Sequence, residues 1–459
     1  MYYFEMKQVL DERFLTRLVE KFRAREIRYY DKLDRYYLVE NDKIKMRSMK
    51  SGKPNNKLAH GFARYITNMA TSYFAGKPVQ YQIENDEYKA CLMDYLDDQY
   101  NFDYEISKAA SKKGIAFELL YINEKGELKS KKYEAQDIIP IYSSKTDEFL
   151  NGFVKIYETR DLDGKLLMDY ADAYDDTTIY HFQRRTKASQ YELTGWEPHY
   201  LDDVPLIVYW NCEEMTGDYE CILSQIDAYD RAQSNTANDM DYFTDAYLVV
   251  TGALGGFVDS EGNEIKPEDA ERNLRNNRIM YLDEKGNAKF LIKETPDTST
   301  ENYKDRLFRD IFFISQVPAM TDESFAGDLS GIAIRYKLIG LEQLAIMKEN
   351  KMRLAKHKKI KMITSWINFK KSKHFDPSMV KQKYTRNFID NISEIIENAS
   401  KLEGQVSRET QLGMLPAEIV PDALEELKKM REEASQEEDL YKDLPETEQD
   451  QEAVNLDEE

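Results

Sequence analysis

Residues Phe62–Val79 read FARYITNMATSYFAGKPV and carry the clearest local structural signal in the chain. Their apolar side chains recur at helical spacing, so residues 57–74 are predicted to form a helix. Gly76 is a natural residue for the end of a helix, and Pro78 prevents the helix from continuing. Residues 79–83 then alternate between apolar and polar side chains, as in a strand. The stretch predicts a helix, a sharp stop and a strand.

Further helices and strands are predicted on both sides of this stretch. Residues 9–35 repeat apolar positions at helical spacing with charges between them, as in an amphipathic surface helix. From Gly114 to Trp210 the apolar period shifts towards two, with turns rich in Gly, Asp and Asn. A β-rich region bracketed by helices gives the expected fold class, which is α+β and mainly helical.

The segment after Trp210 predicts two long helices separated by a compact insertion. Helical spacing extends from Tyr219 to Val250, and the pattern then breaks into a small module with glycine turns and strand-like runs at 278–282 and 289–292. A second helix is expected over 298–317, because Thr298 and Glu301 form a capping box and Pro318 follows. We expect these two helices to lie side by side and antiparallel.

A polar loop and a very long helix follow. The loop contains two glycines and should be exposed, whereas helical spacing extends from Ile332 to about Lys370, with Gly340 as a possible bend. Residues 348–361 of this helix contain seven Lys or Arg and one acid, a net charge of +6. Helical periodicity predicts that Met352, Leu354 and Ile360 lie on its buried side.

The C-terminal part predicts two more helices and an acidic tail. The helices are expected at 386–401 and 421–434. Residues 432–459 contain 13 acids and one base, a net charge of −12, and so carry much of the −21 of the whole chain. Because this segment has few apolar residues, residues 435–459 are predicted to be a solvated, disordered tail.

The composition excludes several classes of protein. Among 459 residues the longest nearly uncharged stretch, 247–258, is too short for a bilayer, and the first residues do not form a signal peptide, so we expect no membrane association. Three cysteines without CxxC spacing argue against a disulfide framework or a zinc site. The sequence has no phosphate-binding loop, no Gly-x-Ser-x-Gly and no His-Glu-x-x-His. We therefore predict no catalytic residue, no metal and no cofactor, and interpret acidic pairs such as Asp202-Asp203 as solvated turns.

The order of these segments resembles the portal proteins of tailed bacteriophages, specifically the siphophage type. Residues 62–79 resemble the helix-Gly-Lys-Pro-strand signature of that family. The run Val204-Pro205-Leu206-Ile207, followed by residues 226–230, resembles the start of the portal stem helix. Residues 330–336 resemble the junction between the tunnel loop and the long helix. The resemblance extends in order from about residue 10 to 430.

The resemblance implies a homo-oligomeric ring, usually of twelve subunits, at one vertex of the capsid. Double-stranded DNA would be packaged and ejected through its channel, driven by a separate terminase ATPase. Head-completion or adaptor proteins, the scaffold and the major capsid protein would be further partners. The protein would reside in the virion after assembly in the host cytoplasm. The alternatives are another head-tail connector or minor capsid protein, or a metal-dependent phage nuclease that uses the acidic clusters.

The family architecture can be carried over onto this sequence as an expectation. It divides the chain into a wing (1–218), a first stem helix (219–250), a clip (251–297), a second stem helix (298–317), a tunnel loop (318–331), a long wing helix (332–375), a crown (376–434) and the tail (435–459).

Two groups of residues are candidates for contact with DNA. The tunnel-loop candidates carry acids and no base, so any contact would be steric or through uncharged side chains; they are Met320, Thr321, Asp322, Glu323, Ser324, Phe325, Gly327 and Asp328. Lys304, Arg306 and Arg309 are predicted either to line the bore or to pair with Asp239, Asp241 or Asp245 of the facing helix. Lys351, Lys358 and Lys361 share one helix face, which predicts either a DNA-facing stripe or pairing with acids of a neighbouring subunit.

Overall fold

The computed structural model describes residues 2–49, 54–96, 99–144, 149–244, 247–251, 257–258, 261, 263–265, 287–291, 297–321, 331–387, 392–415, 419–420 and 422–442. The described residues form a mixed helix and sheet architecture, so the predicted α+β class is confirmed. No helix in these ranges is long and apolar enough to cross a membrane.

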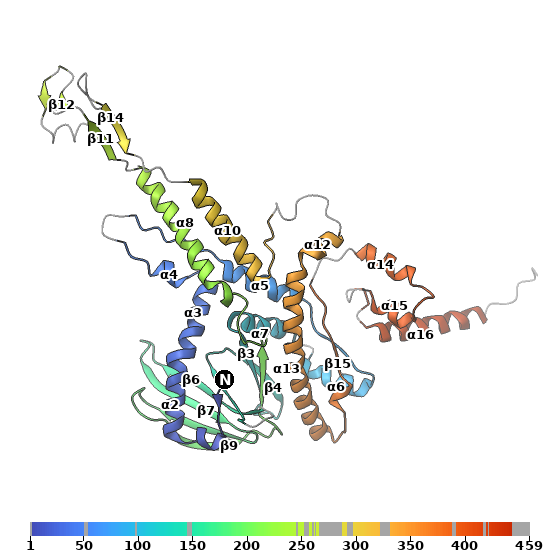
Figure 1. Ribbon diagram of the computed structural model, residues 1–459. Helices are drawn as coiled ribbons and strands as arrows, with labels where there is room; N and C mark the ends of the chain where they lie inside the picture. The colour runs from blue at the N-terminus through green and yellow to red at the C-terminus, as the bar shows by residue number, and fades with distance from the viewer. Residues whose placement is uncertain are drawn as a thin grey trace, which may run out of the picture.

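A six-stranded sheet forms the lower part of the molecule in Figure 1. Its order is β1-β5-β6-β7-β8-β9, and all neighbours are antiparallel except β1 and β5. The strands are β1 (Tyr2–Tyr3), β5 (Ile138–Tyr142), β6 (Leu150–Arg160), β7 (Leu166–Tyr174), β8 (Thr178–Arg184) and β9 (Glu192–Pro198).

The N-terminal helices cover one face of this sheet. They are α1 (Met6–Val9), α2 (Glu12–Phe22), the π-helical turn η1 (Arg23–Ile27) and α3 (Arg28–Tyr37). Leu15, Val19 and Phe22 are buried against Val154 and Phe182 of the sheet. The amphipathic helix predicted over 9–35 is therefore present, interrupted after Phe22 by a π-helical turn of five residues.

The predicted helix and strand are present, but the helix begins at Phe62 and residues 57–61, predicted as its first turn, are not helical. Helix α5 (Phe62–Ala75) ends at Gly76, and β2 (Gln80–Gln82) pairs with the distant β15 (Lys381–Lys383). Gly76 has a φ of −74°, so its role here is not left-handed backbone. A Cβ at this position would lie 2.1 Å from the carbonyl oxygen of Ser72, so the close approach itself requires glycine.

A three-stranded sheet lies next to α5. Its order is β10-β3-β4, formed by β10 (Leu206–Trp210), β3 (Ile115–Ile122) and β4 (Leu128–Tyr133). The helices α6 (Asp86–Leu96) and α7 (Gln99–Lys113) complete this part of the core. The β-rich region predicted between Gly114 and Trp210 therefore contributes strands to two separate sheets.

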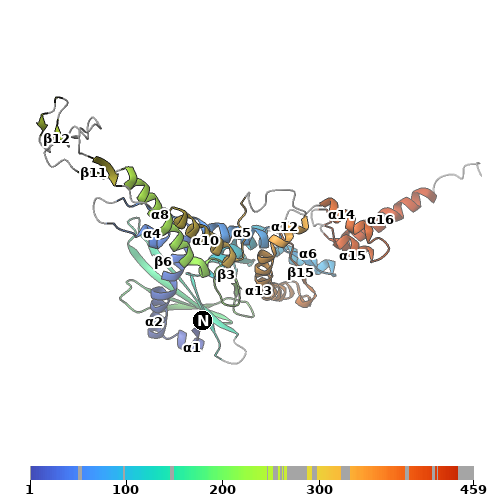
Figure 2. The same cartoon turned by 45° about the horizontal axis from the view of Figure 1, so that its top comes forward.

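A helical hairpin projects from the body and ends in small strands (Figures 1 and 2). The turn η2 (Glu220–Ile222) leads into α8 (Leu223–Thr244), which packs beside α10 (Asp297–Ser315). At the tip, β11 (Tyr247–Thr251) pairs with β14 (Asn287–Leu291), and β12 (Phe257–Val258) pairs with β13 (Glu264–Ile265).

Two predictions for this hairpin differ from the structure. The first helix was expected to reach Val250, but it ends at Thr244 and residues 247–251 are a strand. Three β-branched residues in that run and the antiparallel partner β14 favour the strand. The strand-like run at 289–292 is confirmed as part of β14, whereas the run at 278–282 lies outside the described residues.

The predicted long helix is two helices. The short α12 (Gly331–Lys337) is followed, after Leu338, by α13 (Ile339–Lys371), whose 33 residues extend about 50 Å. Gly340 lies just after this break, and a Cβ there would meet the carbonyl oxygen of Gln316 at 2.9 Å. The helix therefore divides close to the predicted bend.

The remaining helices lie at the end of the molecule away from the hairpin (Figure 2). They are α14 (Ile392–Lys401), α15 (Arg408–Gly413) and α16 (Ala423–Lys442), preceded by the short turn η3 (Pro377–Met379). Helix α16 continues beyond residue 434, into the segment predicted to be a disordered tail. Residues 443–459 lie outside the described part of the chain.

Candidate functional site

The α8–α10 hairpin is held to the body by an aromatic cluster. Phe62 of α5 contacts Tyr229 of α8 and both Phe308 and Phe312 of α10, with ring centroids 5.1 to 6.0 Å apart. All three contacts are edge-to-face, the arrangement that aromatic rings prefer. Helix α5, which forms most of the quoted stretch, therefore contacts both helices of the hairpin at the point where the hairpin leaves the body.

An extended segment before α5 runs along α8. The backbone N–H groups of Asn56, Leu58 and His60 donate to the side chains of Asn238, Ser234 and Asp230 at 2.7, 3.0 and 3.0 Å. Two extended residues span about 6.6 Å and four helical residues about 6 Å, so alternate residues of the segment match every fourth residue of the helix. This segment covers one side of α8, and other sides pack against α10 and Phe62.

Tyr65 fixes the start of the loop that follows α10. Its hydroxyl donates to the carbonyl oxygen of Pro318 and accepts from the backbone N–H of Met320, both at 3.0 Å. Of the predicted loop residues, Met320 and Thr321 are exposed. The other candidates, Asp322, Glu323, Ser324, Phe325, Gly327 and Asp328, lie outside the described residues.

The three basic candidates of α10 have different surroundings. The ammonium group of Lys304 is buried and pairs with Glu301 one turn earlier on the same helix. Arg306 and Arg309 are exposed and line a shallow groove along α10 together with Asp305 and Asp310. Of the acids predicted as alternative partners, Asp245 lies outside the described residues.

The basic run of α13 contains three lysines that sequence analysis did not single out. Lys348, Lys356 and Lys359 are at most 3% exposed. Their ammonium groups pair with Asp218 at 2.8 Å, Asp103 at 2.5 Å and Glu118 at 2.5 Å, all within the same chain. Much of the +6 run therefore lies inside the subunit. Helical spacing could have predicted that two of them are buried, because Lys348 and Lys359 fall on the same helical stripe as Met352 and Ile363.

The pair between Glu118 and Lys359 is fully enclosed. Burial opposes the charge on Glu118, but the nearby ammonium groups of Lys359 and Lys356 outweigh it and hold the pKa of Glu118 below its ordinary value. Burial lowers the pKa of Lys359, an effect that Glu118 partly offsets. Tyr209 donates a further hydrogen bond to Glu118 at 2.6 Å. The carboxylate is thus satisfied on both oxygens.

The three lysines that were predicted as a stripe are less buried than these. Lys358 donates to the carbonyl oxygen of Val204 at 3.2 Å and lies 3.9 Å from Asp203. Lys351 is half-buried and Lys361 is exposed.

The predicted buried side of α13 is only partly correct. Met352 and Ile360 are buried as predicted, but Leu354 is 68% exposed, so its predicted place on the buried side is wrong.

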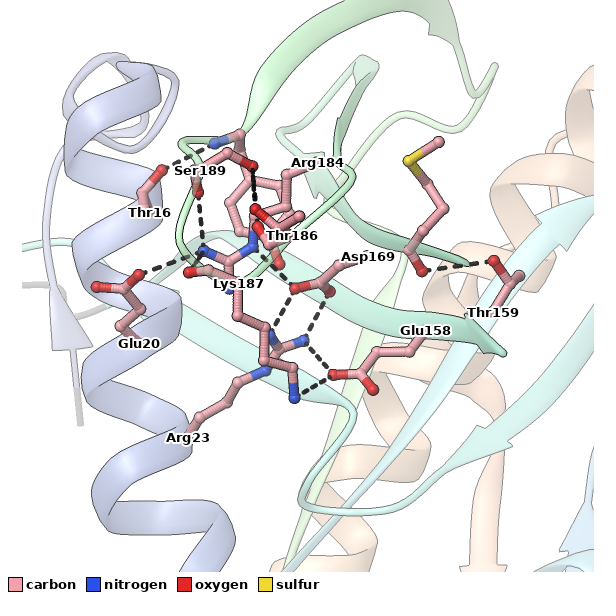
Figure 3. Close-up of polar contacts among 12 residues, drawn as sticks. Thr16, Glu20, Arg23, Glu158, Thr159, Asp169, Arg184, Thr186, Lys187 and Ser189 are labelled. Carbon is pink, nitrogen blue, oxygen red and sulfur yellow. Dashed lines mark hydrogen bonds and ion pairs between the residues drawn. The ribbon is translucent and has the colours of Figure 1, made fainter. Parts of the chain in front are cut away.

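A second buried charge cluster joins the N-terminal helices to the six-stranded sheet. In Figure 3, Arg23 from η1 and Arg184 from β8 converge on Asp169 of β7. Arg23 donates two hydrogen bonds to this carboxylate, at 2.6 and 2.7 Å, and Arg184 donates a third at 2.9 Å. Burial opposes the charge on Asp169, but the two guanidinium groups prevail and lower the pKa of Asp169.

Metal ligation has no candidate in the described ranges. There, no group of three His, Cys, Asp or Glu side chains could hold a metal ion. Asp202 belongs to the pair Asp202-Asp203, which was interpreted as a solvated turn. It is exposed in a bend of the chain and accepts a hydrogen bond from Ser365 at 2.5 Å.

The chain matches a known protein family over most of its length. Residues 19–439 match the family described as phage portal protein, SPP1 Gp6-like. The chain therefore belongs to this family of phage portal proteins. Its members are structural virion components that form rings and associate with the capsid, not enzymes, so the nuclease alternative is set aside.

Two relatives give the same result at the level of individual proteins. The portal protein of Bacillus phage SPP1 is 25% identical over 432 residues, which cover 88% of this chain and 83% of the relative. The portal protein of Clostridium phage phiCD119 is 23% identical over 409 residues, covering 84% of this chain and 86% of the relative. Both matches extend over most of the chain.

Proposed function

We propose that this chain forms the ring-shaped channel at one capsid vertex, usually with twelve subunits in this family, through which double-stranded DNA is packaged and ejected. The match to the portal family over residues 19–439 carries the proposal. A terminase ATPase would supply the work, and head-completion or adaptor proteins would dock on the ring. The scaffold and the major capsid protein would surround it during assembly in the host cytoplasm.

The parts of the chain take the roles that the family architecture implies. The two sheets and their helices, up to residue 218, form the wing, and α13 is the long wing helix. Helices α8 and α10 form the stem, and the strands β12, β13 and β14 at their tip belong to the clip at 251–297. The loop over 318–331 reaches the channel, and α14 to α16 belong to the crown.

The negative net charge of the chain is suited to a channel that does not bind DNA tightly. Each phosphate neutralised by Lys or Arg adds affinity through the release of counterions, so a channel must carry few free cations. The chain has a net charge of −21, and the lysines at 348, 356 and 359 are withdrawn into buried pairs. Arg309 is exposed on α10 and is our candidate for a ring of cations in the bore.

Shortening the loop tests the proposal. Removal of residues 322–328 should leave the mass of the assembled ring unchanged by light scattering, because the hairpin and the wing do not depend on it. The amount of nuclease-protected DNA in capsids should fall sharply. Full packaging by this variant would remove the loop from the mechanism.

A further inference from the structure

Helix α10 has an exposed stripe along one face. Tyr303, Arg306, Asp310 and Phe313 follow one another at spacings of three, four and three residues, which places them on one helix face. Phe313 is 84% exposed and Tyr303 is 50% exposed. The buried side of α10 includes Lys304 and Ile311. We call these four residues the α10 stripe; it has an aromatic ring at each end and opposite charges between them.

A cavity of about 720 Å³ lies on the other flank of the hairpin, between α3, α8 and α4 (Asp42–Lys45). In Figures 1 and 2, α4 and α10 lie on opposite sides of α8. The apolar part of the cavity includes Ile44 and Met46, and Met46 is 75% exposed. We call this cavity the α4 pocket.

The α4 pocket carries an excess of positive charge. Four cations line it, against two acids; the cations are Lys32, Lys43, Arg47 and Arg231. One of the acids, Asp42, is already engaged by Arg35 at 2.6 Å. The Nη1 group of Arg47 is buried and has no hydrogen-bond partner among the described residues. The pocket is therefore suited to a partner that brings a carboxylate and an apolar side chain.

We propose that the α10 stripe of one subunit docks into the α4 pocket of the next. The inference rests on the proposed ring and names the surfaces that close it. The two surfaces are different and lie on opposite flanks of one hairpin, as a head-to-tail contact that repeats around a ring requires. Asp310 would meet the cations of the pocket, and Phe313 or Tyr303 would cover the exposed side chain of Met46.

Variants that disable one surface at a time test this contact. Phe313→Glu disables the stripe and Met46→Glu disables the pocket. Both side chains are exposed, so each variant should fold, as circular dichroism would verify. Each variant alone should elute at the mass of one subunit, 53.9 kDa, where the unaltered chain forms rings. Phe369→Glu is the matched control, because Phe369 is 79% exposed but lies on α13, and it should form rings.

Mixing the two variants gives the sharper result. The intact stripe of the Met46→Glu chain can dock into the intact pocket of the Phe313→Glu chain. The resulting pair cannot extend further, because its remaining pocket and its remaining stripe are both disabled. An equimolar mixture should therefore give particles of twice the subunit mass. Rings from either variant alone, or a mixture that stays monomeric, would overturn this contact and leave the ring itself standing. An unaltered chain that is monomeric would instead overturn the proposed function.

Discussion

Helices α10 and α13 both carry basic residues, and they use them in opposite ways. On α13, Lys348, Lys356 and Lys359 lie on the buried face, where each pairs with an acid of its own chain. On α10, Arg306 and Arg309 are exposed. The difference shows that the position of a base relative to the apolar stripe of its helix decides its role. Buried bases hold the subunit together, and exposed bases remain available to other molecules.

Breaking a buried pair on α13 should have the largest effect. Glu118→Gln leaves the ammonium group of Lys359, which is 1% exposed, without its counter-charge. We expect a loss of about 3–5 kcal/mol in the free energy of unfolding, because an unpaired buried charge is costly. Urea denaturation followed by circular dichroism measures this loss.

Two controls show whether burial is the reason. The double variant Glu118→Gln/Lys359→Met should recover most of the loss, since it removes the orphaned charge as well. Glu397→Gln breaks an exposed pair with Lys401, whose side chains are 67% and 65% exposed, and should change stability by less than about 0.5 kcal/mol. Equal losses of unfolding free energy in Glu118→Gln and Glu397→Gln would contradict the claim that buried pairs stabilise the subunit more than exposed pairs do.

The cluster in Figure 3 should make the six-stranded sheet and its N-terminal helices sensitive to acid. The pKa of Asp169 is lower in the folded chain than its ordinary value of 3.8, so its contribution to stability is complete above that pH and is lost as the pH falls through the folded pKa. Asp169→Asn should lower stability at pH 7 by about 3 kcal/mol, because Arg23 and Arg184 lose their shared partner. Its urea midpoint should also fall less between pH 5 and pH 3 than that of the unaltered chain. Parallel acid dependence of both chains would show that Asp169 is not responsible.

Tyr65→Phe should have a smaller effect, confined to the start of the loop. The variant removes one hydrogen-bond donor to Pro318 and one acceptor for the Met320 N–H, for a loss of about 1–2 kcal/mol. Limited proteolysis should cut near residue 320 faster than in the unaltered chain. Cleavage at an unchanged rate would mean that Tyr65 does not restrain the loop.

Arg309→Gln should have the smallest effect on stability and a selective effect on DNA. The side chain is exposed, so the free energy of unfolding should change by less than about 0.5 kcal/mol. If Arg309 lines the bore, the variant removes one cation per subunit from the path of the duplex, and the salt dependence of the packaging rate should weaken. An identical salt dependence would exclude Arg309 from the bore.

The sequence predicted elements whose signal is local. Helix α10 was expected at 298–317 and is found at Asp297–Ser315, because its apolar stripe, its capping box and Pro318 are all contiguous in sequence. The strand at 247–251 was missed because its partner β14 is about 40 residues away in the chain, and helical spacing alone cannot reveal such a pairing.

The candidate site was predicted less completely. The hairpin and the long helix were predicted from helical spacing, but the buried lysines were not. Lys348 and Lys359 have their acids at Asp218 and Glu118, more than 100 residues earlier, so only the folded chain brings the charges together. Residues 57–60 were wrongly predicted to be helical for the same reason, since the segment Asn56–His60 forms hydrogen bonds with residues 230–238 of α8.

Electron microscopy of the purified chain, viewed along the particle axis, tests the central claim most directly. The account predicts closed rings with a central hole wide enough for a DNA duplex and a narrower projecting stem in side views. A homogeneous population of single subunits at high protein concentration, with no ring in any view, would contradict it.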